Sequence, residues 1–268
     1  MLILAFDTTS ERGGVALHRD LDCLASAANS GTRYSITLFE TVERLLAETG
    51  TALREVELFA VATGPGSFTG IRVGVAAAQG WAQAMDRPVV GVPVLEAMVE
   101  EAWPRADWAV PLLDARRGEF FVSVYHKTSA KDAPDGEAGP SSWGRWGDLR
   151  VQSSRESDRW VTPTGQPGEE PGMLLKSDLV PPFLEGFVKR CTSDETITCL
   201  AREHDAAAQA LRPLALDGLG WQTIDRPLVS AIARLAFFAS REGRVQSPGQ
   251  LDAYYLRRSD AEMHWRES

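Results

Sequence analysis

The sequence predicts an α/β protein assembled from two copies of one strand-and-helix unit. Short apolar runs of strand length alternate with longer stretches in which apolar residues recur at helical spacing. In addition, "AVPLLDARRGEFFVSVYH" repeats the plan of "LILAFDTTSERGGVALH": an apolar strand, an aspartate, a polar turn with glycine, and a second strand that ends in histidine. This repeat pairs Asp7 with Asp114 and His18 with His126, which indicates an internal duplication.

The first copy, residues 1–105, begins with strands and continues with alternating helices and strands. The apolar runs predict strands over residues 2–6, 15–18, 21–28, 58–63 and 88–92. Helices are expected from Ser35 onward, over residues 67–85 and over residues 94–102. In the first helix, five apolar side chains share about 120° of arc at 100° per residue, as on an amphipathic helix. They are Leu38, Phe39, Val42, Leu45 and Leu46.

The second copy, residues 106–268, contains a long segment without periodicity. Residues 127–172 are rich in Pro, Gly, Ser, Asp and Glu and also contain Trp143, Trp146 and Trp160, which indicates a long loop or an insertion. Beyond it, "TITCL" predicts a strand and "PLVSAIARLAFFASREG" a helix. The final stretch "DAYYLRRSDAEMHW" is expected to be extended, and the sequence leaves open whether it packs back on the first copy.

Composition excludes several classes of protein. The net charge of −9 disfavours a chain that binds nucleic acid by itself, because phosphate affinity comes from clustered Lys and Arg. Cys23, Cys191 and Cys199 form no CxxC pair and predict reduced thiols in or near the core. No apolar window approaches the roughly 20 residues of a membrane span, so the sequence predicts a cytoplasmic protein with no membrane partner.

The glycine-rich stretch "VATGPGSFTGIRVG", residues 61–74, resembles a phosphate-binding loop. A Walker loop requires GxxxxGK, and no lysine lies nearby. A dinucleotide fingerprint requires GxGxxG, and after Gly64 and Gly66 the third glycine comes one position late, at Gly70. The stretch is therefore expected to be a tight turn in which Ser67 caps the following helix.

The helix over residues 67–85 carries apolar or small side chains on nearly every side, apart from a narrow polar strip that contains Arg72 and Gln79. Such a helix is buried on more than one side. Either its own domain encloses it completely, or a partner subunit covers the remaining side. The second alternative makes a set of residues on this helix and the preceding one candidates for a partner interface: Leu38, Phe39, Val42, Leu45, Leu46, Gly70, Gly74, Ala78 and Trp81.

Candidates for catalysis are few. The four histidines are scattered and form no metal-binding pair, so no metal site is expected. Asp7 and Asp114 end equivalent strands, and with Thr8 and Ser10 they form a weak candidate nucleotide site of the type that actin-like ATPases and sugar kinases use to hold magnesium. Alternatively, each aspartate simply caps its own turn.

Four stretches together resemble the TsaB family: "ILAFDTTS", "GPGSFTGIRVGVAAAQGWA", "LLDARRGEFFVSVY" and "YYLRRSDAEMHW". The resemblance implies the actin/Hsp70/sugar-kinase-like (ASKHA) fold, with two subdomains from a duplicated βββαβαβα unit. It also implies a non-catalytic scaffold subunit in the pathway that places threonylcarbamoyl on N6 of adenosine 37 in tRNA. Its partners would be the transferase TsaD, the ATPase TsaE and a second copy of itself, through the first two helices.

The resemblance further implies that the chain contacts tRNA only indirectly, through the complex. It also implies that the chain has no cofactor of its own, and that ATP, ADP and metal are bound only through the complex. The alternative is a small-molecule kinase or ATPase of the same superfamily that uses Asp7 and Asp114 around Mg-ATP. One departure from the family is the stretch "AREHDAAAQAL", which stands where a glycine-rich turn that contacts adenosine is expected. This departure disfavours independent nucleotide binding.

Overall fold

The computed structural model describes residues 1–28, 34–127, 143–145, 173–191, 193–203, 205–212 and 216–255. The chain forms two compact units. Unit 1 contains Met1–Glu101 and Arg226–Ser268, and unit 2 contains Ala102–Asp225. The second domain expected over residues 106–268 therefore ends at Asp225, because the chain returns to unit 1 and packs a helix on its sheet.

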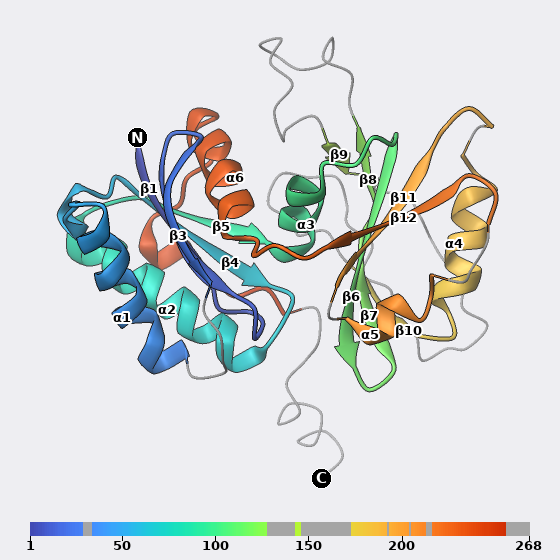
Figure 1. Ribbon diagram of the computed structural model, residues 1–268, viewed down its shortest axis with the longest axis horizontal. Coiled ribbons are helices and arrows are strands. Elements are labelled where there is room, and N and C mark those ends of the chain that lie inside the picture. Colours follow the sequence, from blue (N-terminus) through green and yellow to red (C-terminus); the bar gives the residue numbers. More distant parts are fainter. Residues whose placement is uncertain are drawn as a thin grey trace. The chain divides into compact units, whose positions relative to one another are not determined.

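Unit 1 is built on a five-stranded mixed sheet with the order β3-β2-β1-β4-β5 (Figure 1). Its strands are β1 (Leu2–Asp7), β2 (Gly14–Arg19), β3 (Asp22–Ala28), β4 (Leu58–Gly64) and β5 (Val89–Pro93). Strands β1, β2 and β3 form an antiparallel meander, while β4 and β5 run parallel to β1. All six residues of β1 are buried, as expected for a central strand that is covered on both faces.

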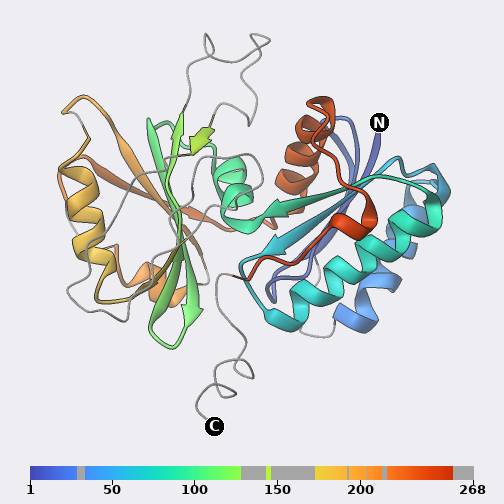
Figure 2. The ribbon, with the colours of Figure 1, turned by 180° about the vertical axis from the view of Figure 1, so that it is seen from behind.

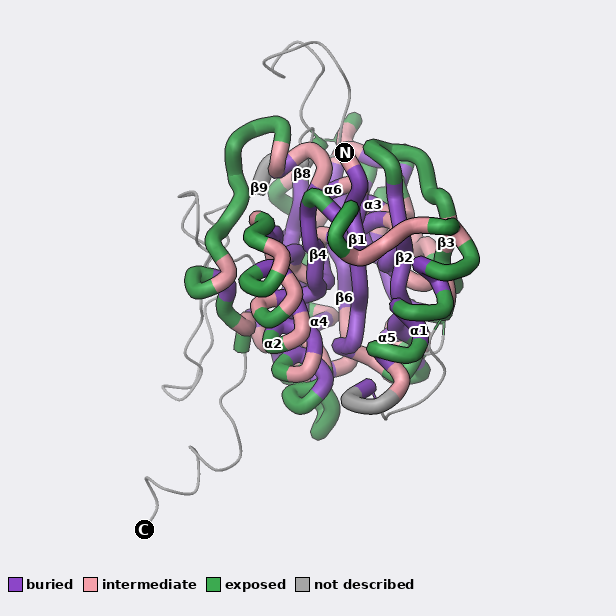
Figure 3. The backbone as a smooth tube through the Cα atoms, turned by 90° about the vertical axis from the view of Figure 1, so that its left-hand side faces the viewer, coloured by how far each residue is buried: buried purple, intermediate pink, exposed green. Residues whose placement is uncertain are grey.

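Helices cover both faces of this sheet. They are α1 (Tyr34–Glu48) and α2 (Phe68–Met85) on one face and α6 (Val229–Arg241) on the other. A further helix, α3 (Val94–Ala102), follows β5. Leu2, Leu4 and Phe6 share one hydrophobic cluster with the apolar residues of α1 and α2. Because side chains alternate along a strand, Ile3 and Ala5 point to the opposite face, where α6 packs on β1 and β2. Figure 3 shows buried strands surrounded by helices whose outer sides are exposed.

Unit 2 repeats this topology with the strand order β10-β7-β6-β11-β12. These strands are β6 (Trp108–Arg116), β7 (Glu119–Val122), β10 (Met173–Lys176), β11 (Ile197–Arg202) and β12 (Leu219–Ile224). As in unit 1, three strands, β6, β7 and β10, pair antiparallel with their neighbours, and β11 and β12 run parallel to the central strand β6. The shared order and strand directions indicate that the two units are copies of one plan, as the repeat around Asp7 and Asp114 predicts.

Some elements of unit 2 were not predicted from the sequence: β10, β12, α4 (Val180–Val188) and the short α5 (Ala206–Gln209). Two prolines follow Val180 in the first turn of α4, where proline is well tolerated, and they would have been a usable signal. Of the expected insertion over residues 127–172, only Lys127 and the short strand β9 (Trp143–Arg145) lie within the described residues. Strand β9 pairs with β8 (Tyr125–Lys127), which continues the pairing with β6.

Among the described residues, no helix is both long enough and apolar enough to cross a membrane.

Candidate partner-binding surface

The glycine-rich loop is a tight turn that leads directly into α2. Ser67 is the N-cap of the helix, and its side chain accepts a hydrogen bond from the backbone N–H of Gly70, as the sequence predicts. The backbone N–H of Ser67 donates to the carbonyl oxygen of Thr9 at 2.7 Å. These donors are used within the chain, so the loop is packed on the turn that follows β1.

The helix glycines allow close contact within unit 1, which corrects the expectation that they admit a partner. A Cβ on Gly70 would lie 1.9 Å from the carbonyl oxygen of Thr8, and one on Gly74 would lie 2.4 Å from Thr8 Oγ1. The hydroxyl of Thr8 in turn donates to the carbonyl oxygen of Gly70 at 2.7 Å. The backbone that approaches α2 therefore belongs to the end of β1, and neither glycine can contact a second subunit.

Most apolar residues proposed for the interface face the core of unit 1, which is a second correction. Five of them have exposed fractions of 7% or less: Leu38, Val42, Leu45, Leu46 and Ala78. They share a hydrophobic cluster with β1, β2 and β4. The sheet presents an apolar face that a helix must cover, and the apolar stripe of α1 covers it. Substitutions at these positions would therefore test folding and not binding.

Two of the predicted interface residues, Phe39 and Trp81, remain partly accessible on the outer side of the helices. Phe39 is 49% exposed although it is a large apolar side chain. It packs edge-on against Trp81, with ring centroids 5.1 Å apart, and Trp81 also contacts the rings of the core residues Phe6 and Phe59. Trp81 therefore connects the exposed ring of Phe39 to the hydrophobic core.

We call this surface the α1/α2 outer face (Figure 3). It consists of Phe39 on α1 and six small or apolar residues of α2 that are exposed or half-buried. The six are Val73, Ala76, Ala77, Gly80, Trp81 and Ala84. Solvent-exposed helix positions usually carry charged or polar side chains. An aromatic residue beside small residues forms a surface suited to helix packing.

The polar strip of α2 binds a segment from the far end of the chain, whose packing on the first unit the sequence left open. We call residues 246–255 the C-terminal strap. Gln79 donates to the carbonyl oxygen of Leu251 at 2.8 Å, and Arg72 donates to the hydroxyl of Tyr255 at 3.0 Å. Leu251 is only 3% exposed and joins the hydrophobic core. Figure 2 shows the strap alongside α2, so this side of the helix is covered within unit 1.

The candidate nucleotide residues of unit 1 are engaged in their own turn. Asp7 Oδ1 accepts hydrogen bonds from the backbone N–H of Thr9 at 2.8 Å and from its hydroxyl at 2.6 Å. The carbonyl oxygen of Ser10 accepts hydrogen bonds from the hydroxyl of Tyr34 and from the backbone N–H of Gly13. This is the turn-capping arrangement that the sequence offered as the alternative to a nucleotide site.

Asp114 in unit 2 has a similar local role. Its Oδ1 accepts a hydrogen bond from the backbone N–H of Arg116 at 2.7 Å, and its own N–H donates to Asp205 Oδ2 at 2.7 Å. Asp205 also caps α5 through a hydrogen bond from Ala208. Within the described residues, no group of three or more His, Cys, Asp or Glu side chains is arranged to hold a metal ion.

Buried charges lie on the other face of the unit 1 sheet. Arg234 on α6 donates from Nε to Glu100 at 2.6 Å and from Nη2 to Glu101 at 3.3 Å, which ties α6 to α3. Burial raises the pKa of Glu100 despite this ion pair. His18 is 1% exposed, and burial, with a smaller contribution from Arg234, lowers its pKa to about 4. Its Nε2 lies 3.2 Å from Ser230 Oγ. A buried, neutral histidine of this kind stabilises packing.

The cysteines differ in their surroundings. Cys199 is buried, which raises the pKa of its thiol, and partial burial raises the pKa of Cys191 to about 11. Cys23 lies on the outer strand β3 and is exposed, which corrects the expectation of a thiol in or near the core. All three thiols are free.

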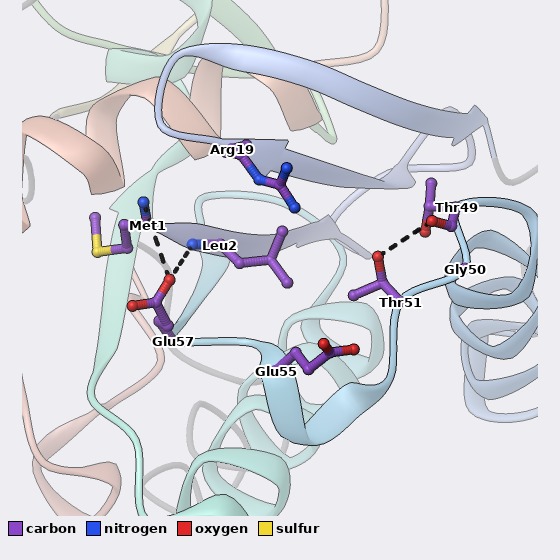
Figure 4. Close-up of a pocket in the computed structure, with 8 residues that line it drawn as sticks. All are labelled: Met1, Leu2, Arg19, Thr49, Gly50, Thr51, Glu55 and Glu57. Atoms are coloured by element: carbon purple, nitrogen blue, oxygen red, sulfur yellow. Dashed lines mark hydrogen bonds and ion pairs between the residues drawn. The ribbon is translucent and has the colours of Figure 1, made fainter.

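A polar hollow of about 340 Å³ lies beside the N-terminus (Figure 4). The N-terminal ammonium group is 2.7 Å from Asp20, and the backbone N–H of Leu2 donates to Glu57 at 2.7 Å. The hollow is lined by Met1, Leu2, Arg19, Thr49, Gly50, Thr51, Glu55 and Glu57. Because its walls are polar and largely exposed, it lacks the enclosed apolar lining of most small-molecule sites.

Comparison with known proteins supports the family predicted from the motifs. The family model described as "TsaD: tRNA N6-adenosine threonylcarbamoyltransferase" matches residues 28–138. The chain is 35% identical over 129 residues to the "tRNA threonylcarbamoyladenosine biosynthesis protein TsaB" of Escherichia coli, covering 47% of this chain and 56% of that protein. It is 32% identical over 126 residues to the protein of the same name from Bacillus subtilis, covering 47% and 55%. The chain thus spans about half the length of the curated relatives that it matches.

A solved structure extends the comparison to the whole fold. The chain is similar to an uncharacterized Pseudomonas aeruginosa protein described as similar to peptidase YeaZ, with a TM-score of 0.67 and 22% identity, over 96% of this chain and 99% of that one. The chain therefore has the α/β fold of that protein, and the common strand order of its two units agrees with the predicted duplication. The resemblance to the TsaB family is likewise confirmed.

Proposed function

We propose that this chain, which resembles the TsaB family, is a non-catalytic subunit in the synthesis of N6-threonylcarbamoyladenosine in tRNA. In this proposal it pairs with a TsaD transferase, and TsaE joins the resulting complex. The chain contacts tRNA only as part of that complex and binds no cofactor of its own. The similarity to two curated TsaB proteins over about half of the chain is the observation that carries this proposal.

The α1/α2 outer face is the surface that we assign to the partner. It presents the 49% exposed ring of Phe39 beside small side chains on α2, so helices of a second protein can approach closely. A helix-on-helix contact would remove Phe39 from water, and large aromatic residues of this kind commonly dominate interface energies. The matched family model begins at residue 28 and so includes both helices. A second copy of this chain is an alternative occupant of the same face.

The local geometry favours a non-catalytic role. Asp7 and Asp114, which the alternative kinase or ATPase would use around Mg-ATP, each accept hydrogen bonds from their own turns. Thr8 is fully buried and bonded to Gly70. Nothing in this geometry specifically favours the kinase or ATPase.

Complex formation tests the proposal with a pair of matched variants. Phe39→Asp places a charge in the α1/α2 outer face, whereas Leu24→Asp places one on β3, where Leu24 is 40% exposed. Both substitutions leave the core of unit 1 intact, so both variants should fold. We expect Phe39→Asp to lose co-purification with the TsaD of the same organism, with binding weakened at least about 30-fold, or about 2 kcal/mol. Leu24→Asp should bind as wild type does.

A reconstituted tRNA modification assay, with and without this chain, provides the functional readout. We expect modification to require wild-type chain and to be lost with Phe39→Asp. Wild-type chain that neither binds TsaD nor supports modification would refute the function. Equal binding by Phe39→Asp and Leu24→Asp would refute only the assigned face. ATP turnover by the isolated chain that is abolished in Asp7→Asn would instead support the kinase or ATPase.

A further inference from the structure

One arginine of α2 is held in a fixed position at the surface of unit 1. The guanidinium carbon of Arg72 lies 3.9 Å from the centroid of the Phe68 ring, within the range of a cation–π interaction. Its Nε donates to the hydroxyl of Tyr255 at 3.0 Å, and the centroids of the two aromatic rings are 5.0 Å apart. We call Phe68, Arg72 and Tyr255 the arginine clamp.

The C-terminal strap, which runs alongside α2 (Figure 2), fixes the clamp from a second direction. The backbone N–H of Tyr254 donates to the carbonyl oxygen of Thr63 at 2.9 Å, and Leu251 is buried in the core of unit 1. The backbone that carries Tyr255 is therefore attached to the sheet immediately before the clamp. Because its own helix and the strap both hold the guanidinium group of Arg72, little side-chain entropy remains to be lost when it binds a partner.

The clamp is open to solvent and lacks a negative charge to pair with. Phe68 is 37% exposed and Tyr255 38%, and Arg72 is also exposed. Helix α2 contains no acidic residue, and the only one in the strap, Asp252, accepts a hydrogen bond from the backbone N–H of Ala253. Within the part of the chain that the structure describes, Arg72 forms no ion pair and only its Nε donates a hydrogen bond. Its Nη1 and Nη2 are therefore available to a ligand.

The clamp adjoins the α1/α2 outer face. At about 100° per residue, Ala76 lies one turn after Arg72 and about 40° around the helix, and Gly80 follows at about 80°. Both residues belong to the outer face, and neither side chain is large enough to hold a packed helix away from the guanidinium group. Arginine and aromatic residues are also the types that are common in the energetically dominant part of protein interfaces. A protein that covers the outer face therefore reaches the clamp as well.

We propose that Arg72 binds a carboxylate of the protein that covers the α1/α2 outer face. This inference rests on the proposed function, in which that protein is a TsaD transferase, and it specifies the chemistry of one contact. The guanidinium group can donate two parallel hydrogen bonds, from Nη1 and Nη2, to the two oxygens of an Asp or Glu side chain. Phe68 and Tyr255 are positioning residues for this contact. The small and apolar surroundings, in a chain of net charge −9, favour a protein over nucleic acid as the ligand.

Three variants separate the charge of Arg72 from the packing of the strap. Arg72→Gln removes the charge, whereas Gln79→Ala removes the other hydrogen bond between the side chains of α2 and the strap without changing the charge. Arg241→Gln removes a positive charge from α6, on the opposite face of the sheet. The Kd for TsaD is measured by calorimetry at about 50 mM and about 500 mM salt. Thermal melts of each isolated variant establish that it is folded.

For Arg72→Gln we expect the affinity for TsaD to fall about tenfold at the lower salt concentration. The difference from wild type should be smaller at the higher concentration, because salt screens the partly exposed ion pair of the wild type. Gln79→Ala and Arg241→Gln should bind within about twofold of wild type, since neither change removes a charge from the clamp. All three variants should remain folded, because the altered side chains lie outside the hydrophobic core.

The variant Arg72→Lys identifies the carboxylate directly. A carbodiimide activates a carboxyl group, and an amine in contact with that group then forms an amide bond with it, without a spacer. In the complex we expect mass spectrometry to find a peptide that joins position 72 to an Asp or Glu of TsaD. Arg72→Gln, which has no amine at this position, is the control and should give no such peptide.

Equal binding of TsaD by wild type and Arg72→Gln overturns the inference and leaves the proposed function standing. An equal loss of affinity in Gln79→Ala also overturns the inference, because the strap and not the charge is then responsible. The same holds if no cross-link to a TsaD carboxylate forms, or if Arg72→Gln weakens only self-association or only the binding of unmodified tRNA by the complex. Wild-type chain that does not bind TsaD at all overturns both the inference and the proposed function.

Discussion

Replacing Gly70 by alanine tests the close packing of α2 on the end of β1. The added Cβ would lie 1.9 Å from the carbonyl oxygen of Thr8, whereas ordinary contacts of this kind lie at 3.4–4 Å. The helix would have to move by roughly 1.5 Å, and Thr8 cannot yield easily because it is a buried backbone segment bonded to Gly70 itself. Strain from overpacking a core typically costs about 1–3 kcal/mol or more.

The intrinsic preference of helices for alanine over glycine works against this strain by about 1 kcal/mol. For Gly70→Ala we therefore expect a net loss of about 2 kcal/mol in the free energy of unfolding. Gly80→Ala is the matched control, because Gly80 lies on the same helix and nothing lies within 4 Å of its added Cβ. This control should gain about 0.5–1 kcal/mol, so the two variants should differ by about 3 kcal/mol.

Urea unfolding followed by circular dichroism measures this difference. With an m-value of about 2–3 kcal/mol/M, Gly70→Ala should lower the midpoint by about 0.7–1 M, and Gly80→Ala should raise it slightly. If Gly70→Ala proves as stable as Gly80→Ala, the close approach of α2 to Thr8 is absent and the explanation of the glycine motif fails. Unchanged m-values would confirm that both variants unfold from the same compact state.

Two further predictions concern titration and thiol reactivity. The pKa of His18 is about 4 in the folded protein and about 6.5 in the unfolded chain. The contribution of neutral His18 to the free energy of unfolding is therefore complete above pH 6.5. It is lost as the pH falls towards 4, by up to about 3 kcal/mol. Because the pKa of Glu100 is raised, its contribution to stability changes with pH in the opposite direction, and it does so equally in wild type and in His18→Gln. Wild type should therefore lose more stability than His18→Gln between pH 7 and pH 5 in thermal melts, and parallel curves would contradict the pKa of His18. Separately, iodoacetamide should label Cys23 in the native protein and Cys199 only after unfolding, as peptide mass spectrometry can establish. Labelling of both at equal rates would contradict the burial of Cys199.

The sequence determined the secondary structure of unit 1 well, because local signals were strong there. The apolar run over Leu2–Asp7 and the helical stripe that contains Leu38 and Val42 each reflect one periodicity, and the structure follows both. Ser67 was identified as a cap because a serine before an apolar helix has few other local roles. The duplication was also readable, since Asp7 and Asp114 lie at or near the ends of the equivalent strands β1 and β6.

Only the tertiary structure decided which faces are buried and which remain exposed. Periodicity shows that a helix has an apolar face, but it does not distinguish a sheet from a partner as the covering surface. The sequence therefore made Gly70 a candidate for contact with a partner, but Gly70 packs against the backbone of Thr8 in the same unit. Phe39 is the apolar residue that remains exposed. Contacts between distant segments, such as Gln79 with Leu251, leave no periodic signal in either segment, because the physical interaction exists only once the chain has folded.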